Sequence, residues 1–400
     1  MKLKRFAAFI LLALALFSFA ACGVKEEQPS LSSASSAEPA PPEPEDSVAR
    51  VMAVGDNLIH NVIYNQAKQR GTAELEYDFS YVYENVKPII QKADVAFINQ
   101  ETVLAGKYFE PSNFPRFCTP TEMGDCLLDV GFNVFNHANN HMLDKGQKGI
   151  AATLEYWDTK ADEDICILGM YKDENDLYSC HYIEKNGIKF GFFGFTEHTN
   201  GLSAPKDMTE RIVYASQEEV IKKAVDVMRA ECDVVIVSAH WGNENYSERT
   251  TTALTSLEKE LSQKLADWGV DVIIGTHPHV IQPMKWLDRA DGGRTFCIYS
   301  LGNFVSAMNG PCNMLGGLVD FDVRKDGRTG EITVENICYV PIVTHYGRGM
   351  SNVKLYPLSE YTEELASAHG CKSKTYAGFS LKYLNKVVTD NIEEEYLFEK

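Results

Sequence analysis

The stretch VDVIIGTHPH, residues 270–279, decides the fold that we expect for this chain. Its first half is apolar and β-branched, as in a strand that is buried on both faces. Gly275 ends this run, and His277 and His279 follow on either side of Pro278. Two imidazoles beside the end of a buried strand could be metal ligands, or they could belong to a turn whose backbone the proline fixes.

Similar apolar runs alternate with helical patterns along the chain. Strands are expected at residues 48–54, 94–98, 132–135, 164–168, 181–184, 189–195, 233–239, 271–275, 295–301, 318–324 and 332–340. Helices are expected at residues 80–93, 121–131, 146–161, 216–231 and 255–269. Because most of these strands lack apolar–polar alternation, both faces should be covered, with helices outside. We therefore predict an α/β sandwich with mixed sheets.

The N-terminal segment has the pattern of a secretory signal, with a basic start and an apolar run that ends in Ala20-Ala21-Cys22. It resembles a bacterial lipoprotein signal, although Phe19 stands where leucine is usual. This resemblance implies lipid attachment at Cys22. An uncleaved anchor is the alternative, but the run is short of the roughly 20 residues that a span needs. Either would hold the protein at the outer face of the bacterial cytoplasmic membrane.

The chain divides into four segments by composition. Residues 1–22 form the predicted lipoprotein signal, and residues 23–48 are rich in Ser, Pro and Glu and predict a disordered spacer. Residues 49–345 contain the strand and helix patterns of the globular domain. Residues 346–400 carry no motif, and we expect a C-terminal extension that is helical.

Charge and cysteine content exclude several classes of protein. The net charge is −18, so there is no electrostatic attraction to the negatively charged phosphate backbone of a nucleic acid. Nucleic acid is therefore not an expected partner. The 10 cysteines include no CxxC pair, and lipidation of Cys22 would leave an odd number. Most of them lie in apolar runs. We therefore expect neither a disulfide framework nor a structural zinc site.

Polar side chains follow many of the predicted strands at their carboxyl ends. They are Asp56 with His60, Asn99 with Glu101, Asn139, Asn140 and His141 with Asp144, His240 with Glu244, His277 with His279, and Asn303. Ligands of open α/β sheets bind at this edge, whereas core packing gives polar groups no reason to gather there. Histidine with carboxylate and amide oxygens suits manganese, iron or zinc. So many ligands indicate two ions that share a carboxylate.

Most of these residues also have a structural interpretation. Asp56 could cap the next helix, His240 could be a satisfied interior histidine, and one of Asn139 and Asn140 could serve a turn. Asp144 is interpreted as a helix cap that orients His141. Glu244 is interpreted as support for the ligands or a substrate contact, and Asn303 as the residue that fixes its loop. The histidines treated as structural or surface residues are His137, His181, His198, His345 and His369.

Six blocks carry a resemblance to a known family: GDNLIH, NQETVL, ANNHMLDKG, HWGNEN, GTHPHVIQP and SLGNFV. In this order they resemble the bacterial capsule-synthesis CapA family, which is associated with poly-γ-glutamate capsule and belongs to the calcineurin-like metallophosphoesterase superfamily. The resemblance implies a four-layer αββα sandwich with a site for two divalent ions. Such ions activate water for attack on phosphorus.

The resemblance also implies roles for individual residues. Asp56, Asn140, His240, His277 and His279 match metal ligands, and His141 matches the group that protonates the leaving oxygen. The chain departs from the pattern twice. His60 stands four positions after Asp56 rather than two, and Glu101 takes the place of the bridging aspartate, with Asn99 as its rival.

Three functions remain open on the sequence alone. The first is a metal-dependent phosphoesterase-type hydrolase in capsule or cell-envelope polymer biosynthesis. The second is a non-catalytic subunit of a polymer synthesis or export complex. The third is a metal-dependent hydrolase of amide bonds in the polymer, since two-metal sites also serve peptidases. The acidic composition would repel polyglutamate unless metal ions or a local basic patch intervene, which weighs against direct polymer binding.

Overall fold

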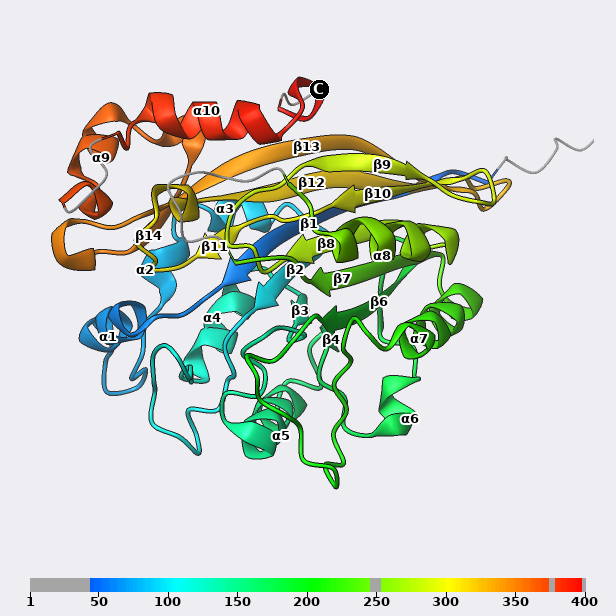
Figure 1. The fold of residues 1–400 in the computed structure, drawn as a ribbon, viewed down its shortest axis with the longest axis horizontal. Coiled ribbons are helices and arrows are strands. Elements are labelled where there is room, and N and C mark those ends of the chain that lie inside the picture. Colours follow the sequence, from blue (N-terminus) through cyan, green and yellow to red (C-terminus); the bar gives the residue numbers. More distant parts are fainter. Residues whose placement is uncertain (1–43, 245–252, 374–377, 398–400) are drawn as a thin grey trace, which may run out of the picture. The chain divides into compact units, whose positions relative to one another are not determined.

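The computed structural model describes residues 44–244, 253–373 and 378–397. They form two mixed β-sheets that pack face to face around a shared apolar core (Figure 1). The predicted signal and most of the predicted spacer lie outside the described residues. In these ranges, no helix combines the length and the apolar character that crossing a bilayer requires.

The first sheet has eight strands and contains the N-terminal strand of the domain. In spatial order its members are β14 (Lys354–Pro357), β13 (Ile332–His345), β12 (Leu315–Lys325), β1 (Ser47–Asn57), β2 (Val95–Gln100), β3 (Val134–Asn136) and β4 (Cys166–Leu168). The last four run parallel, whereas β12 to β14 pair antiparallel. A short strand, β11 (Asn303–Val305), lies parallel to the end of β1. The carboxyl ends of β1 to β4 therefore lie at the same edge of the sheet.

The second sheet has six strands. Their spatial order is β5 (Tyr182–Lys185), β6 (Ile188–Thr196), β7 (Val234–His240), β8 (Val272–Thr276), β10 (Arg294–Ile298) and β9 (Met284–Asp288). Neighbouring residues along a strand enter different cores. Ile236 and Ile274 join the core between the sheets, whereas Val237 and Ile273 join the core under the helices. This double burial explains why the strands read as continuous apolar runs.

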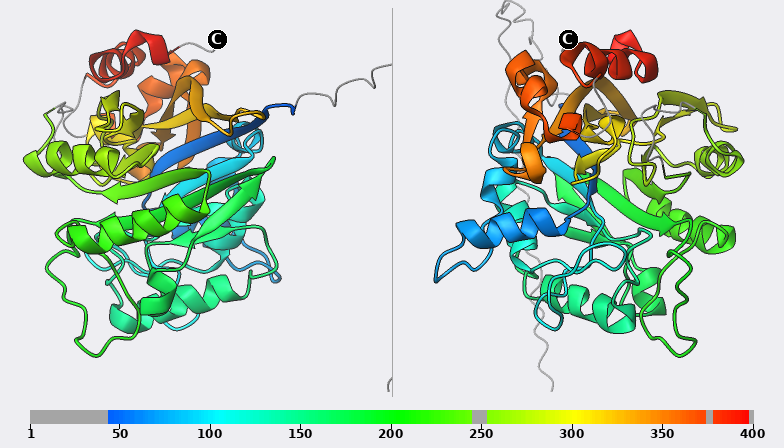
Figure 2. Two further views of the ribbon diagram at one scale, coloured as in Figure 1. Left: turned by 90° about the vertical axis from the view of Figure 1, so that its right-hand side faces the viewer. Right: turned by 60° about the vertical axis from the view of Figure 1, so that its left-hand side comes forward.

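Helices cover the outer faces of both sheets. On the second sheet these are α7 (Glu218–Glu231) and α8 (Ser256–Asp267), and on the first they include α2 (Ser80–Tyr83), α3 (Lys87–Ile90) and α4 (Glu122–Val130). The helix α10 (Leu381–Asn391) packs against the core cluster that the two sheets share. Figure 2 shows these layers from two further directions. The remaining helices are α1 (Asn61–Arg70), α5 (Gly146–Asp158), α6 (Glu174–Leu177) and α9 (Glu363–Ala368). The predicted four-layer αββα sandwich is confirmed.

Two expectations about the elements are corrected. The helix expected at residues 80–93 is split into α2 and α3, because Pro88 has no N–H to donate to the carbonyl of Glu84 and its ring clashes there. The extension after residue 345 is not only helical. Its strand β14 pairs with β13, with Lys354 opposite His345, so the first sheet continues past the expected boundary. Short strands such as β14 have too few residues to show a period.

Candidate metal centre

The carboxyl ends of β1, β2, β3, β7 and β8 bring six of the predicted ligands to one edge of the paired sheets. Asp56 and His240 lie at strand ends, and the others lie in the loops that follow. All six are at most 2% exposed: Asp56, Glu101, Asn140, His240, His277 and His279. So many buried polar side chains require partners, because an unsatisfied buried polar group costs about 1–3 kcal/mol.

These residues form two overlapping groups that share one carboxylate. Glu101, His240 and His277 make the first group, and Asp56, Glu101 and His279 make the second. In each group the candidate ligand atoms lie within 4.8 Å of one another. Glu101 therefore occupies the position that a carboxylate bridging two ions requires, a position for which the sequence left Asn99 as the rival.

The donor set fits a pair of divalent cations. Both carboxylate oxygens of Glu101 and Nε2 of His277 are buried and have no hydrogen-bond partner among the described residues. The Nε2 atoms of His240 and His279 are each 3.8 Å from Glu101 Oε1, which is too long for a hydrogen bond. Burial and the charge of Asp56 raise the pKa of Glu101 well above its ordinary value. A cation at this point would supply the partner that the Glu101 oxygens and His277 Nε2 lack among the described residues.

The imidazoles have pKa values that favour ligation. Burial and the neighbouring imidazoles lower the pKa of His240 and of His277 well below the ordinary value, so both rings are neutral, as ligation requires. Burial also opposes the charging of His279, but the carboxylates of Glu101 and Asp56 outweigh it and raise the pKa of this ring to about 9. A divalent cation would take the place of that proton.

Side-chain amides orient the ligands from behind. Asn99 Nδ2 donates to Asp56 Oδ1 at 2.8 Å and lies 3.4 Å from His240 Nδ1. On the other side, His279 Nδ1 lies 3.0 Å from Asn303 Oδ1 and 3.1 Å from Asp56 Oδ2. Because these contacts are made by Nδ1, the Nε2 atom of each ring is directed toward Glu101. A ligating histidine is usually oriented in this way, through a hydrogen bond at its other ring nitrogen. Asn99 and Asn303 thus have supporting positions.

The loop after β3 supplies the third amide. Asn140 Oδ1 lies 3.1 Å from His240 Nε2, and its Nδ2 donates to Glu244 Oε1 at 3.2 Å. The amide oxygen therefore faces the same point as the imidazole. Asn139 has a different environment: its Nδ2 donates to the carbonyl of Gln100 at 3.0 Å, and its Oδ1 accepts from the next-but-one backbone N–H. Asn139 is the turn residue of the pair.

The predicted proton donor lies beside this cluster. His141 Nδ1 is 2.7 Å from Asp144 Oδ2, and the same oxygen accepts the backbone N–H of Phe117 at 2.7 Å. The Phe117 ring meets the imidazole edge to face at 4.7 Å between centroids. Asp144 therefore holds the ring of His141 through Nδ1, as the sequence suggested.

His60 has a different position from the other predicted ligands. It is the residue before α1, and its Nδ1 lies 3.1 Å from the carbonyl of Leu58 and 3.2 Å from the backbone N–H of Ala307. It is absent from both groups found among the described residues. Burial lowers its pKa to about 4, so the ring is neutral. A ligand role for His60, which would have to use Nε2, stays a prediction.

The backbone of the opening stretch is strained where the two histidines lie. His277 has φ 99° and His279 has φ 57°, in the left-handed region that costs a residue with a side chain about 1–2 kcal/mol. Gly275 is required just before them, because a Cβ there would lie 1.9 Å from the carbonyl oxygen of Tyr299. Strained residues of this kind cluster at functional sites, where the surrounding structure holds them in place.

Sequence reasoning missed two neighbours of the centre. His198, treated as structural or on the surface, has its ring 5.0 Å from that of His277. Glu197 Oε2 accepts the backbone N–H of Gly242, just after His240, at 2.9 Å. Both residues directly follow β6, so the rule that polar residues at strand ends form the site would have found them.

A hollow of about 480 Å³ adjoins the centre. Its lining includes His60, Asn61, Asn113, Phe114 and Asn313. Asn313 Nδ2 donates to the carbonyl of His279 at 2.9 Å, which connects the hollow to the ligand loop. The described residues that line it include no Asp, Glu, Lys or Arg. This space therefore suits an uncharged group.

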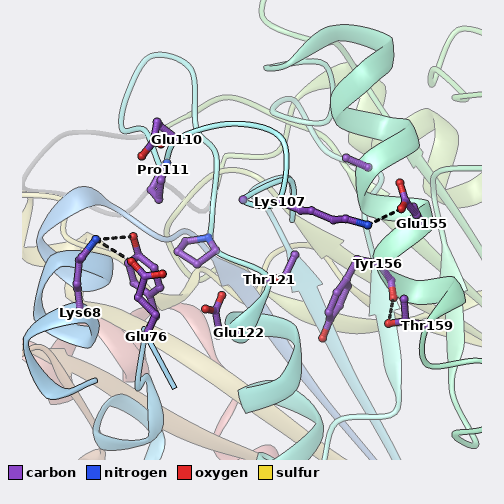
Figure 3. A pocket seen from close by; sticks show the side chains of 14 residues that line it. Lys68, Glu76, Lys107, Glu110, Pro111, Thr121, Glu122, Glu155, Tyr156 and Thr159 are labelled. Atoms are coloured by element: carbon purple, nitrogen blue, oxygen red, sulfur yellow. Dashed lines mark hydrogen bonds and ion pairs between the residues drawn. The ribbon is translucent and has the colours of Figure 1, made fainter. Parts of the chain in front are cut away.

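A second hollow, of about 530 Å³, contains none of the predicted site residues. Figure 3 shows it between two ion pairs, Lys68 with Glu76 and Lys107 with Glu155. Glu122 also lines it. Each lysine that lines it is already paired with a carboxylate, and Glu110 and Glu122 add negative charge, so this hollow does not suit an anionic ligand.

Comparison with known proteins finds relatives whose names refer to capsule biosynthesis. The chain is 27% identical to the PGA biosynthesis protein CapA of Bacillus subtilis over 73% of this chain and 72% of that protein. It is 29% identical to the capsule biosynthesis protein CapA of Bacillus anthracis over 63% of this chain, and the match spans 60% of that relative, less than two thirds.

A phosphatase from Mycoplasma pneumoniae of known structure is similar at 16% identity and a TM-score of 0.41, over 74% of this chain and 94% of that one. This likeness is too distant to assign an activity. The family profile described as bacterial capsule synthesis protein PGA_cap matches residues 50–308. The resemblance expected from the six sequence blocks is confirmed, and the chain belongs to this bacterial capsule synthesis family.

Proposed function

We propose that this protein is a divalent-metal-dependent hydrolase of the phosphoesterase type that acts in capsule or cell-envelope polymer biosynthesis. The observation that supports this proposal is the sharing of Glu101 between two groups of ligands, with both of its oxygens buried and unpartnered among the described residues. Two ions at such a site polarise a phosphoryl oxygen and activate a water molecule. Manganese, iron and zinc all suit these ligands.

The side chains of the centre would have different roles. Asp56 and His279 would hold one ion, and His240, His277 and Asn140 would hold the other, with Glu101 common to both. Asp144 fixes Nδ1 of His141 at 2.7 Å, so the proton for the leaving oxygen would come from Nε2.

The surroundings suggest how a substrate would lie. The anionic phosphoryl group would meet the cations and the imidazoles, whereas an uncharged part of the substrate would enter the hollow beside the centre. Asn61, Asn113 and Asn313 offer hydrogen bonds there, and Phe114, which is 66% exposed, offers a ring face.

We also propose that the protein works at the outer face of the cytoplasmic membrane, beside a capsule polymer synthesis complex. The lipoprotein-like segment that ends in Cys22 supports this location. Replacement of Cys22 by Ser should move the protein from the membrane fraction to the soluble fraction. Retention of the variant at the membrane would contradict lipid anchoring.

Metal analysis with parallel turnover assays tests the hydrolase. The full chain should bind two ions and hydrolyse a generic phosphodiester, and both properties should fall in His279→Ala and Asp56→Ala. His181→Ala is the control, because this imidazole lies next to β5 and bonds the carbonyl of Asp176. Unchanged metal content in both site variants would remove the proposal.

The same assays separate the two rival functions. Bound metal with no turnover of phosphoesters or polymer would indicate a non-catalytic subunit. Bound metal with cleavage of polyglutamate alone would indicate the amide hydrolase.

A further inference from the structure

Two cysteines that are distant in sequence meet at one edge of the second sheet. The Sγ atoms of Cys180 and Cys232 are 3.1 Å apart, closer than non-bonded sulfur atoms normally approach, although 52 positions separate the residues. Cys180 lies just before β5, and Cys232 is the residue that ends α7. Their meeting therefore depends on the fold and not on the local chain.

The strand between them carries a glycine where the sulfur atoms need space. β6 lies between β5 and β7, and its Gly191 is opposite Tyr182 on one side and Val235 on the other. A Cβ on Gly191 would lie 2.8 Å from Cys232 Sγ, so any side chain there would displace the sulfur. The absence of a side chain lets Cys232 lie over β6 and reach Cys180.

The surroundings favour covalent pairing over metal binding. Neither cysteine belongs to a group of metal-ligating side chains found among the described residues. Both are half-buried, so a small reagent can reach them, and the sequence predicts export to a compartment where disulfides persist. Cys180 and Cys232 are both thiols in the structure, and a single bridge between them is compatible with the expectation that the chain has no disulfide framework.

We propose that Cys180 and Cys232 form a disulfide that joins the edge strand β5 to the connection between α7 and β7. The oxidant is an organic disulfide, either a small molecule or a dithiol oxidant protein. One cysteine attacks it and releases the first thiol, and the second cysteine then displaces the other half. Two protein thiols and one organic disulfide thus give one protein disulfide and two thiols, which carry away both protons and both electrons.

The order of the two steps follows from the surroundings of the sulfurs. Burial, together with the neighbouring Cys180, raises the pKa of the Cys232 thiol to about 12. A thiol with so high a pKa is a poor first attacking group, so Cys232 is better suited to the second step, in which its sulfur already lies against the mixed disulfide.

Peptide mapping of the full chain tests the pairing. The protein is incubated with oxidised glutathione, blocked with N-ethylmaleimide and digested without reductant. We expect one dominant linked peptide pair containing Cys180 and Cys232, which disappears after reduction. Recovery of both cysteines as N-ethylmaleimide adducts from folded protein would overturn the proposal. This readout requires neither metal nor activity, so it stands or falls separately from the proposed hydrolase.

Thermal unfolding gives a second readout with matched variants. Closing so long a loop should raise the Tm, so reduction of the wild type should lower it by about 5 °C or more. Cys180→Ser should lack this response, whereas Cys126→Ser, which changes a half-buried cysteine on α4, should keep it. An equal response to reductant in wild type and Cys180→Ser would contradict the bridge.

Discussion

Replacing Glu101 by Gln should reverse the order of stability of wild type and variant between metal-free and metal-loaded conditions. Without metal, burial and the charge of Asp56 raise the pKa of Glu101 although His279 opposes them, so folding at pH 7 must take up a proton or bury a carboxylate that has no hydrogen-bond partner among the described residues. Relative to the ordinary value of 4.5, proton uptake costs about 1.36 kcal/mol per pH unit, or up to ~3 kcal/mol at pH 7. Glutamine has nearly the same volume and avoids this cost, so the metal-free variant should be the more stable protein.

Metal should have the opposite effect. An ion present at 100 times its Kd stabilises the folded state by about 2.7 kcal/mol, so two ions give the wild type ~5 kcal/mol. Because Glu101 belongs to both groups of ligands, the variant loses both of these contributions, which together exceed the ~3 kcal/mol that the substitution recovers. Wild type should therefore be the more stable protein in manganese, and its hydrolysis of phosphodiester should fall at least 100-fold on substitution, as expected for a residue that supports both ions.

Urea unfolding in chelator and in manganese measures both halves of this prediction. Glu122→Gln is the matched control, because burial raises the pKa of this carboxyl as well. Glu122 lines the hollow of Figure 3 and belongs to neither group of ligands. Its stability should shift equally in the two conditions. The prediction is contradicted if wild type is already the more stable protein in chelator, or if manganese stabilises Glu101→Gln as much as it stabilises wild type.

Three further predictions concern the loop, the proton donor and the C-terminal region. Gly275→Ala places a Cβ 1.9 Å from a backbone carbonyl and should lower the free energy of unfolding by about 3 kcal/mol or prevent folding, whereas Gly378→Ala, with nothing within 4 Å, should be neutral in the same unfolding assay. Asp144→Asn weakens the hold on His141 and should lower kcat about 10–100-fold with bound metal unchanged, and a parallel loss of metal would contradict the assigned role. Burial lowers the pKa of His369 to about 4, so as the pH falls below 6.5 the unfolded chain binds a proton at this residue before the folded protein does. The contribution of this one histidine to the metal-free free energy of unfolding should therefore fall by up to ~3 kcal/mol between pH 6.5 and 4. His369→Gln should lose correspondingly less stability than wild type when unfolding is followed across that range.

Local features of the sequence were sufficient for the sandwich and for most of the ligand set. A strand buried on both faces shows as an apolar run, and the polar residues at or just after its end are visible directly, as at Asp56, His240 and His277. Parallel strands share one edge, so polar residues at their ends could be expected to meet. The same rule, applied to the end of β6, would have included His198, so that omission was an error of application.

Only the tertiary structure gives Asn99 and Glu101 different surroundings. The two residues are two positions apart, and side chains at that spacing lie on the same side of a strand, so no pattern could separate them. The distances to His240 and His279 place Glu101 in both ligand groups and leave Asn99 behind Asp56.

The same limit applies to the short strands and to the thiol pair. β11 and β14 have three and four residues, and they exist because a partner strand supplies their hydrogen bonds. Cys180 and Cys232 meet only because β6 lies between their elements with Gly191 at the crossing point. The chain by itself determined which residues are apolar, which are candidate ligands and roughly where strands end. Which of them touch depended on sheet register and stacking, because those contacts join segments that are far apart in sequence.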